Sequence, residues 1–518
     1  MRKKFKVLQI GPNSYKDEFN YLNNVYWEVL HESLLSQPDT VLENMAYILK
    51  KVKTFDFILI ETEISDGLLT ILNQLIAPYN TYVVSNYWDG FKDLQISHDM
   101  LIREFKADNH DHLIERIKSI AFVGQYGDKI HPKSIIPNEM FKGDVYHQGN
   151  KCIVFEGDFG TDFQPLATWQ YNIFYERDKV LEIWPEFKLE GDVDIQLTFR
   201  MQHSGSIDEI FEEFTVSLSE LDEPIKISRR EYEAFLAVSI QAKGTGKIAL
   251  GALHRRWSRL EFGSFLMGGN RFSDGDRDEF IYYFNPGDLK PPLNVYFSGY
   301  RTAEGFEGYF MMNMFHAPFL LIGDPRLEGG SFYMGSEEYE NKIKSVILES
   351  LDYLGFKETD LILSGLSMGS FGALYYGAQL NPTAVIAGKP LVNIGTIADN
   401  MKLLRPRDFG TANDMVYALT GGTDQEHIHE LNNKFWEVFS TQELKNTTFG
   451  LSYMENDDYD LFAFDDLLPI LTKRKAKTIS RAITGRHNDD SSTINNWFIH
   501  FFNIILQTKF GRASYERK

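Results

Sequence analysis

The chain has 518 residues, of which 43% are hydrophobic and 24% are charged. This is the composition of a globular protein, and it excludes a disordered or membrane-embedded chain. A formal charge of −20 opposes non-specific binding to nucleic acid or to an anionic membrane surface.

The length predicts about three domains. The single cysteine, Cys152, excludes internal disulfides and a thiolate metal cluster. The chain starts with a basic head, but its first apolar run ends at Gly11-Pro12 and is too short for a signal peptide. No apolar run approaches the roughly 18 residues of a membrane-spanning helix. We therefore expect a cytoplasmic protein that is at most peripheral at the inner face of the membrane.

Residues 1–145 alternate between strand and helix patterns, which is typical of a parallel, Rossmann-like sheet. Short apolar runs predict strands at 5–10, 55–60, 81–85 and 119–124, and a helical pattern covers 43–52. Only one glycine follows the first run, so the dinucleotide-binding fingerprint G-x-G-x-x-G is absent. This favours a structural or partner-docking role over cofactor binding.

Residues 146–288 have a hydrophobic period of two. Polar and apolar side chains alternate at 192–202, and similar short runs lie at 214–218 and 247–253. Half-buried strands at this spacing predict a β-sandwich.

Two features of this β-rich region resemble binding sites, and each also has a simpler explanation. Trp169, Trp184 and Trp257 are either core residues or aromatic faces that stack on sugar rings, so carbohydrate binding stays open. The carboxylates of 274–279 alternate as in a calcium loop, but the remaining ligand positions are missing. We therefore predict a solvated turn there.

Residues 289–518 return to the α/β rhythm, after a Pro291-Pro292 pair that we interpret as a linker. The patterns predict strands at 293–300, 317–323, 361–363, 384–388 and 447–454, and helices at 337–354 and 491–507. Repeated βα units of this kind are the plan of an α/β-hydrolase. The predicted fold class is therefore α/β: an α/β-hydrolase-like catalytic domain preceded by a Rossmann-like and a β-sandwich-like region.

The stretch Leu361 to Tyr376 predicts a strand, a sharp turn and a helix around Gly365-Leu-Ser-Met-Gly369. G-x-S-x-G alone is a short pattern, but this context is that of a nucleophile elbow, where glycines let strand and helix approach closely. Ser367 would be the nucleophile, and the amide of Met368 would donate to an oxyanion.

A serine nucleophile needs a base, which in this fold follows the acid and precedes the last helix. His487 occupies that place. His427 and His429 lie in a charged helical stretch, and His316 precedes the nucleophile, so these three fit less well.

The acid is expected in the turn after the 447–454 strand, which holds Asp457, Asp458 and Asp460. We predict Asp457, the first at the expected offset, and the choice among the three stays open. The second oxyanion donor is predicted at Tyr300, in a Ser-Gly-Tyr-Arg turn. The alternative for this segment is an ordinary glycine turn.

The segment 285–301, Asn-Pro-Gly-Asp-Leu-Lys-Pro-Pro-Leu-Asn-Val-Tyr-Phe-Ser-Gly-Tyr-Arg, and the elbow at 365–369 together resemble a known family. It is the family of the second accessory secretory protein in the Gram-positive system that exports serine-rich-repeat glycoprotein adhesins. The resemblance covers nearly the whole chain. It implies an α/β-hydrolase-like O-acetyltransferase that modifies N-acetylglucosamine on the adhesin, with Ser367, Asp457 and His487 as the triad.

The same resemblance implies a role in export. The partners would be the glycoprotein adhesin, the sister accessory secretory proteins and the accessory Sec motor ATPase. No tightly bound cofactor is expected, and the sequence does not identify the acetyl donor because it has no recognisable coenzyme A or nucleotide motif.

Two other functions stay open at this point. A cytoplasmic carboxylesterase or acetyl-esterase would use the same triad with water as the acceptor. A non-catalytic, adhesin-binding export scaffold would keep the fold without the chemistry, since fold does not imply function.

Overall fold

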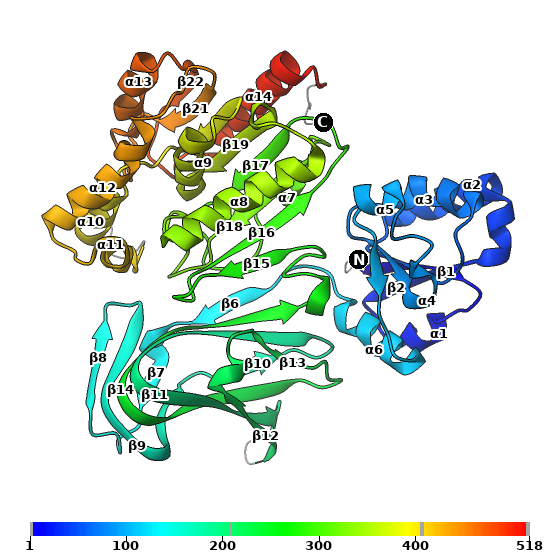
Figure 1. Cartoon of the computed structure of the whole chain (residues 1–518), viewed down its shortest axis with the longest axis horizontal. Coiled ribbons are helices and arrows are strands. Elements are labelled where there is room, and N and C mark those ends of the chain that lie inside the picture. The colour runs from blue at the N-terminus through cyan, green and yellow to red at the C-terminus, as the bar shows by residue number, and fades with distance from the viewer. Residues whose placement is uncertain (1–3, 207–208, 405–408, 514–518) are drawn as a thin grey trace.

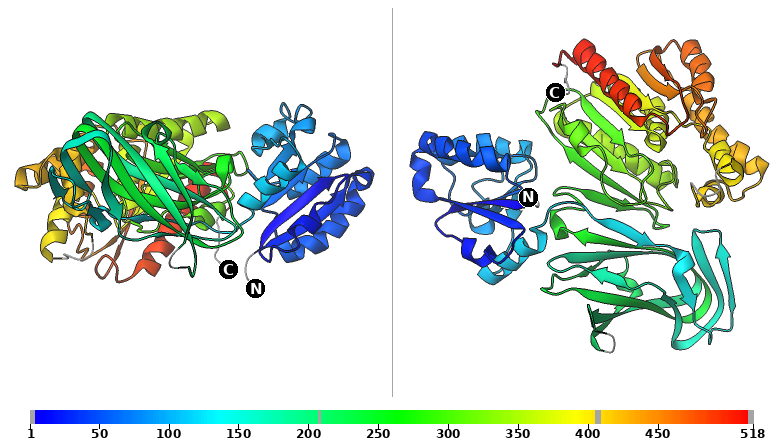
Figure 2. Two further views of the ribbon diagram at one scale, coloured as in Figure 1. Left: turned by 90° about the horizontal axis from the view of Figure 1, so that it is seen from below. Right: turned by 180° about the vertical axis from the view of Figure 1, so that it is seen from behind.

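The computed structural model describes residues 4–206, 209–404 and 409–513. Their strands form three sheets that follow one another along the chain (Figure 1). The N-terminal α/β unit lies to one side of the other two, and both views in Figure 2 agree on this arrangement. The β-rich unit packs below the C-terminal α/β unit in the view of Figure 1.

The N-terminal unit has a five-stranded parallel sheet in the order β2-β1-β3-β4-β5. Its elements are β1 (Phe5–Gly11), α1 (Lys16–Phe19), β2 (Val25–His31), the 3₁₀ turn η1 (Glu32–Ser36), α2 (Pro38–Val52), β3 (Phe57–Ile60), α3 (Asp66–Leu75), β4 (Thr81–Val84), α4 (Ser85–Trp88), α5 (Gln95–Asp99), β5 (Arg103–Phe105) and α6 (His110–Ile120). Successive residues of β1 enter different cores: Val7 packs with residues of α6, and Leu8 packs with residues of α2 and α3. The sheet is therefore covered on both faces, as parallel sheets require.

The expected strand at 119–124 is wrong. Ser119 and Ile120 end helix α6, and the hydroxyl of Ser119 donates to the carbonyl of Glu115 one turn earlier. The apolar residues Leu113 and Ile117 continue to Ile120 at helical spacing, so the run begins in the last turn of a helix, and its residues from Ala121 on follow that helix without forming a strand.

The central unit is built on one nine-stranded sheet with the path β12-β11-β14-β9-β7. Its elements are β6 (Gly127–Ile130), η2 (Pro132–Ser134), β7 (Ile135–Pro137), β8 (Asp144–Gln148), β9 (Cys152–Trp169), β10 (Ile173–Tyr175), β11 (Val180–His203), β12 (Ile210–Ser217), η3 (Leu218–Glu220), β13 (Ile225–Ile227), β14 (Ala234–Ser258) and η4 (Leu260–Phe262). The predicted strands at 192–202, 214–218 and 247–253 lie in β11, β12 and β14, apart from Leu218, which starts η3.

The central sheet departs from a sandwich of two separate sheets, because its longest strands bend over a line of glycines. Gly157, Gly246 and Gly191 are register partners across β9, β14 and β11, and all three have positive φ. A Cβ at the nearby Gly244 would lie 2.0 Å from the carbonyl oxygen of Asp192. Residues on both sides of this line share one apolar core. A single sheet that folds over itself at the glycines therefore buries its apolar face, as the two facing sheets of a sandwich would.

The C-terminal unit has an eight-stranded sheet in the order β15-β16-β18-β17-β19-β20-β21-β22. The pairs from β17 with β18 through to β21 with β22 are parallel, and β15 and β16 are antiparallel additions at one edge. Its elements are β15 (Asn270–Ser273), β16 (Glu279–Asn285), β17 (Leu293–Phe297), α7 (Tyr309–Asn313), β18 (Phe319–Gly323), α8 (Glu337–Leu354), η5 (Glu358–Asp360), β19 (Leu361–Leu366), α9 (Met368–Leu380), β20 (Ala384–Gly388), α10 (Ile394–Leu404), α11 (Ala412–Thr420), α12 (Gln425–Phe439), β21 (Thr448–Met454), α13 (Ala463–Lys473), β22 (Lys477–Ile483) and α14 (Ser491–Phe510).

Helices cover both faces of this sheet. Phe297 of β17 packs in a core with residues of α8 and α9, whereas Tyr296, its neighbour in the same strand, packs in another core with residues of α14. Every predicted element of 293–507 is present within a few residues of its expected bounds. Helices α10, α11 and α12, between β20 and β21, form a group beside the sheet (Figure 1), and of these the sequence indicated only the charged helical stretch around His427 and His429, which lies in α12.

The three sheets divide the chain differently from the expected boundaries at 145 and 288. β6 and β7 precede residue 145 but pair with β14 and β9 of the central sheet. β15 and β16 precede residue 288 but pair within the C-terminal sheet. The proline pair at 291 and 292 therefore connects two strands of one sheet, β16 and β17.

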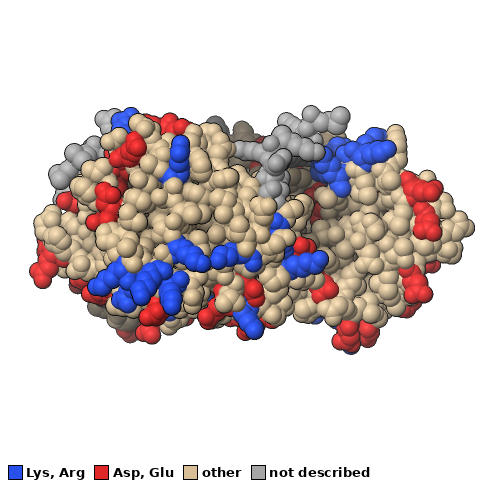
Figure 3. All heavy atoms as spheres, turned by 90° about the horizontal axis from the view of Figure 1, so that it is seen from above, with Lys and Arg blue, Asp and Glu red and all other residues tan. Residues whose placement is uncertain are grey.

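Charge is unevenly distributed on the surface. Figure 3 shows one face on which Lys and Arg side chains lie in a row, despite the net charge of −20. The segment 473–481 holds five basic residues and no acidic one. Its strand β22 is the edge of the C-terminal sheet, and Lys477 and Arg481 are exposed there, which discourages pairing with another sheet.

Among the residues that the structure describes, no helix is both long enough and apolar enough to cross a membrane.

Candidate active site

Ser367 lies between strand and helix. β19 ends at Leu366, α9 begins at Met368, and Ser367 has φ 54° and ψ −123°, a strained conformation for a residue with a side chain. A Cβ at Gly365 would lie 2.0 Å from the carbonyl oxygen of Gly369, and one at Gly369 would lie 2.0 Å from that of Phe297. Both glycines of the motif are therefore required by close backbone contacts, as a nucleophile elbow demands.

His487 lies against the serine. Its Nε2 is 2.8 Å from the Oγ of Ser367, although 120 residues separate them in the chain. Its Nδ1 is 2.8 Å from one carboxylate oxygen of Asp457 and 3.0 Å from the other. His487 is 2% exposed and Asp457 4%, and the ring of Tyr459 packs against the imidazole. The three predicted triad residues thus form one hydrogen-bonded chain that ends at the half-buried serine.

The three aspartates of the 457–460 turn have different partners. Asp457 contacts the imidazole of His487, whereas Asp458 accepts the backbone N–H of His487 at 3.1 Å. The Asp460 carboxylate accepts the backbone N–H groups of Val392 and Asn393, both at 2.8 Å, in the segment after β20. The pKa of Asp460 is raised, because the effect of burial exceeds the opposite effect of these N–H donors. Only Asp457 therefore lies where it can orient the imidazole.

The other histidines lie away from Ser367. His427 lies in the first turn of α12, where its Nδ1 is 2.8 Å from the carboxylate of the N-cap residue Asp424, and His429 lies in the same helix. His316 is exposed in the turn before β18. His487 is thus the predicted base that the structure brings to the serine.

The predicted oxyanion donors lie in helix α9 and in the loop that follows β17. Met368 is the first residue of α9, so its N–H has no acceptor within that helix. A Cβ at Gly330 would lie 2.4 Å from the Cε of Met368, which shows how closely the 324–335 segment covers this side chain. Tyr300 is 37% exposed, and its ring packs beside Gly329 and the ring of Phe409.

Lys389 is a buried cation of the site that sequence reasoning missed. It follows β20 directly, is 8% exposed, and its Nζ lies 3.3 Å from the hydroxyl of Ser491 at the start of α14. The pKa of Lys389 is lowered, because the effect of burial exceeds the opposite effect of the carboxylates of Asp457 and Glu307. The sequence held no signal for this residue, because a single lysine after a strand is ordinarily solvated.

The loop after β17, which carries Tyr300, is anchored to the central sheet by a second group of residues that sequence reasoning missed. Glu304, 6% exposed, lies 2.5 Å from the Nδ1 of His254 and accepts a hydrogen bond from the Nε of Arg256 at 2.5 Å. Arg256 also contacts Glu279 of β16 through two nitrogens, and Glu186 lies 2.8 Å from the Nε2 of His254. These buried ion pairs join β11 and β14 to the C-terminal unit.

Two of the three tryptophans of the central unit are buried. Trp169 is 4% exposed and Trp184 2%, and the guanidinium groups of Arg271 and Arg277 cover the Trp184 ring. Trp257 is half-buried against other aromatic rings and Lys179. The faces of Trp169 and Trp184 are thus not open to a glycan in this structure.

The acidic turn at 274–279 is more buried than the solvated turn that we predicted. Asp274, 7% exposed, accepts the backbone N–H groups of Asp276 and Asp278 and the hydroxyl of Ser336. Asp278 pairs with Arg326, so the turn attaches β15 and β16 to the rest of the sheet. No cluster of three or more His, Cys, Asp or Glu suited to a metal occurs in the described part of the chain.

Comparison with known proteins gives one family. Residues 5–512 match the family model described as the accessory Sec system GspB-transporter. A Staphylococcus aureus protein, named as an accessory Sec system protein, is 49% identical over 100% of this chain and 99% of its own length. A Streptococcus gordonii protein that carries the same name is 38% identical over 99% of this chain and 100% of its own.

A solved structure covers the same length. A chain of the Glycosylation Associate Protein (Gap123) complex from Streptococcus agalactiae superposes with a TM-score of 0.91 at 38% identity, over 99% of this chain and 100% of that chain. Agreement along the whole length, in sequence and in fold, leaves one conclusion. The chain belongs to the GspB-transporter family of the accessory Sec system.

Proposed function

We propose that this protein is an O-acetyltransferase that acylates N-acetylglucosamine residues on a serine-rich-repeat glycoprotein adhesin, and that it also takes part in the export of that adhesin. One observation carries the catalytic part: Ser367 sits on a strained elbow with its Oγ 2.8 Å from His487, whose other nitrogen contacts Asp457. A serine, a histidine and a carboxylate in this order of contact activate a hydroxyl for acyl transfer.

The first half-reaction forms an acyl-enzyme. The Nε2 of His487 accepts the proton of the Ser367 hydroxyl while Oγ attacks the carbonyl carbon of an acetyl ester or thioester. The N–H of Met368, with that of Tyr300, stabilises the oxyanion of the tetrahedral intermediate. Asp457 stabilises the imidazolium and holds its tautomer, and the imidazolium then gives its proton to the leaving group.

The second half-reaction transfers the acetyl group. A sugar hydroxyl loses its proton to His487 and attacks the acetyl carbon, and Ser367 leaves with that proton. Transfer competes with hydrolysis, so the site has to position the sugar and limit water. The buried Trp169 and Trp184 do not supply that positioning, and the ring of Tyr300, which is 37% exposed and packs on the buried Phe409, is the better candidate.

The substrate and the export role rest on the family. Its model is named for a transporter of GspB, and the Streptococcus agalactiae relative is named as part of a glycosylation-associated complex. These names fit a protein that handles a glycosylated cargo together with sister accessory proteins. The accessory Sec motor ATPase is the further partner that we propose, and the site of action is the cytoplasm, on the adhesin before export.

Mass spectrometry of the adhesin glycans tests this proposal. The adhesin is co-expressed with the wild-type chain, with Ser367→Ala and with Ser345→Ala, a control serine on α8 whose hydroxyl donates only to Glu349. We expect the acetyl additions to disappear with Ser367→Ala alone. Unchanged acetylation with Ser367→Ala would overturn the enzymatic role. Scoring secretion of the adhesin in the same cells separates acetylation from export.

The two alternative functions give distinct results in this experiment. An esterase would release acetate from simple esters in a Ser367-dependent way and leave the glycans without acetyl groups. A scaffold would support secretion equally with and without the Ser367 hydroxyl and show no esterase activity. The intact chain of contacts from Ser367 to Asp457 argues against the scaffold.

A further inference from the structure

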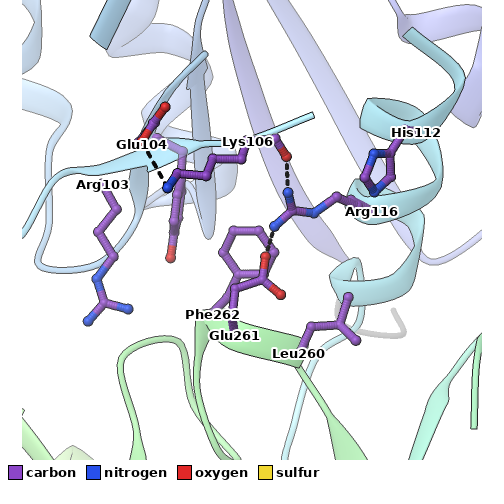
Figure 4. Close-up of a pocket in the computed structure, with 9 residues that line it drawn as sticks. Arg103, Glu104, Lys106, His112, Arg116, Leu260, Glu261 and Phe262 are labelled. Carbon is purple, nitrogen blue, oxygen red and sulfur yellow. Dashed lines mark hydrogen bonds and ion pairs between the residues drawn. The ribbon is translucent and has the colours of Figure 1, made fainter. Parts of the chain in front are cut away.

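The N-terminal unit has a cavity of about 560 Å³ that the proposed reaction does not use. It lies between β4, β5 and α6 on one side and the 260–262 turn, which follows the last strand of the central sheet, on the other (Figure 4). A volume of this size accommodates a small organic molecule.

The cavity lies beside β4 and the edge strand β5 of the parallel sheet. The strand order β2-β1-β3-β4-β5 is that of doubly wound folds, whose usual ligand site lies outside the carboxyl ends of the strands where the order reverses, here between β1 and β3, so this cavity is a different place. Lys106 directly follows the carboxyl end of β5, and His112 and Arg116 lie in the helix that comes next. The missing glycine fingerprint excludes a backbone phosphate cradle after β1, but not a site made of side chains after β5.

Cations exceed anions around this cavity, in a chain of net charge −20. The Nζ of Lys106 lies 3.5 Å from the carboxylate of Glu104 and is exposed, and Arg116 contacts Glu261 (Figure 4). Arg103 has no acidic partner within 4.0 Å anywhere in residues 4–206, 209–404 and 409–513, and its guanidinium rests on the ring of Tyr79. One full positive charge is therefore available to a ligand.

Tyr82 adds a second and independent observation. Its ring lines the cavity and is fully buried, stacked on Phe57 and edge-on to Phe262. Within the described part of the chain its hydroxyl has no hydrogen-bond partner. Burial raises the pKa of Tyr82, against Arg103 and Arg259, which lower it. A buried donor without an acceptor is costly and rare, and a ligand oxygen would remove that cost.

We propose that this cavity binds a small phosphorylated molecule with a flat apolar portion, such as a nucleotide. The phosphate oxygens accept from Arg103, Lys106 and the Tyr82 hydroxyl, while the apolar portion packs against Leu260 and Phe262. The forked guanidinium of Arg103 suits a phosphate better than a point charge would. The Arg103 side chain, whose guanidinium rests on the ring of Tyr79, turns toward the ligand.

Isothermal titration of the full chain with ADP, inorganic pyrophosphate and adenosine tests this site. We expect saturable binding of ADP at one site, weaker binding of pyrophosphate and none of adenosine. Arg103→Gln and Tyr82→Phe should each weaken ADP binding about tenfold or more, because each removes a donor to phosphate. The control Lys92→Gln removes an exposed cation of the same unit that pairs with Asp89, and it should leave binding unchanged.

Thermal unfolding without ligand supplies the second measurement. Because the Tyr82 hydroxyl has no partner among the described residues, Tyr82→Phe should keep or raise the melting temperature of the free protein while it weakens ADP binding. Ser367→Ala should bind ADP like the wild type, which separates this site from the proposed reaction. Failure of ADP and pyrophosphate to bind, equal binding by Arg103→Gln, or a lower melting temperature of free Tyr82→Phe would overturn the proposal.

Discussion

The carboxylate of Asp457 faces the Nδ1 of His487 with both oxygens, at 2.8 and 3.0 Å, and both side chains are almost completely buried. This arrangement fixes the imidazole with its Nε2 toward Ser367. The two neighbouring aspartates, Asp458 and Asp460, accept backbone N–H groups and do not contact the imidazole through the bonds described above. The three aspartates should therefore respond differently to substitution.

Replacing Asp457 by Asn should abolish most of the acyl-transfer activity while the protein stays folded. The amide presents the wrong donor pattern to the imidazole, and we expect a loss on the order of a thousandfold or more in kcat. Asp458→Asn, which alters a contact to the backbone of His487 and leaves the Asp457 contact to the imidazole in place, should cost less than about tenfold. Steady-state hydrolysis of p-nitrophenyl acetate measures both, and similar losses in the two variants would contradict the assignment of Asp457.

The buried Asp460 should matter for stability more than for chemistry. Its carboxylate accepts two backbone N–H groups after β20, so Asp460→Ala leaves them unpaired and should lower the free energy of unfolding by about 1–3 kcal/mol. Urea denaturation measures this effect. A stable but inactive Asp460→Ala protein would mean that this residue, and not Asp457, acts on the histidine.

Ser367→Ala should lower kcat by at least about a thousandfold without lowering the melting temperature. Alanine keeps the Cβ and the backbone of the elbow and removes the hydroxyl that contacts His487, so we expect little change in stability. Labelling with a fluorophosphonate probe should modify the wild-type chain and Ser345→Ala once each and Ser367→Ala not at all. Labelling of Ser367→Ala at another serine would place the nucleophile elsewhere.

The elbow glycines should not accept a side chain. Gly369→Ala would place a Cβ against the carbonyl oxygen of Phe297, and we expect it to destabilise the protein by about 3 kcal/mol and to abolish activity. Gly275→Ala is the matched control, since its Cβ would meet nothing closer than 3.9 Å, and it should change stability by less than about 0.5 kcal/mol. Thermal unfolding and esterase assays compare them. A fully active Gly369→Ala protein would contradict the close packing of α9 on β17.

The ion pairs of Glu304 predict how stability depends on pH. Burial opposes its charge, but Arg256 and His254 outweigh burial and lower the pKa of Glu304 to about 2. Likewise burial opposes the imidazolium, but Glu304 and Glu186 outweigh it and raise the pKa of His254. The glutamate therefore stabilises the fold above its ordinary pKa of about 4.3 and loses this effect as pH falls toward 2. The histidine stabilises it below about 6.5 and loses this effect as pH rises through its raised pKa.

Melting temperatures between about pH 3 and about pH 9, a range that brackets the ordinary pKa values of both groups, should thus show a plateau with a decline on each side. Glu304→Gln should be less stable on the plateau by about 3 kcal/mol or more, since it leaves buried cations unpaired, and its profile should be flatter. Glu43→Gln, an exposed residue of α2, is the control and should keep the wild-type profile. An unchanged profile in Glu304→Gln would show that other groups set the pH dependence.

Much of the site could be predicted because it is local. Strand, serine and helix are contiguous from Leu361 to Tyr376, and the glycines on either side of Ser367 report the close approach of backbones directly. The order of nucleophile, acid and base along the chain is equally visible in the sequence. Hydrophobic period likewise indicated which regions are α/β and which is β, since a strand and a helix bury their faces at different spacings.

The tertiary structure decided what depends on distant contacts. Three aspartates within four residues look alike in sequence. The shape of the folded turn decides that Asp457 contacts the imidazole of His487 and that Asp460 accepts the backbone N–H of Val392. Trp169 is a core residue because a line of glycines, aligned across three long strands, folds one sheet over itself, and Trp184 is covered by Arg271 and Arg277. The ion pair of Glu304 with His254 and the buried hydroxyl of Tyr82 carry no sequence signal, because the burial and partners of a side chain are set by residues far along the chain.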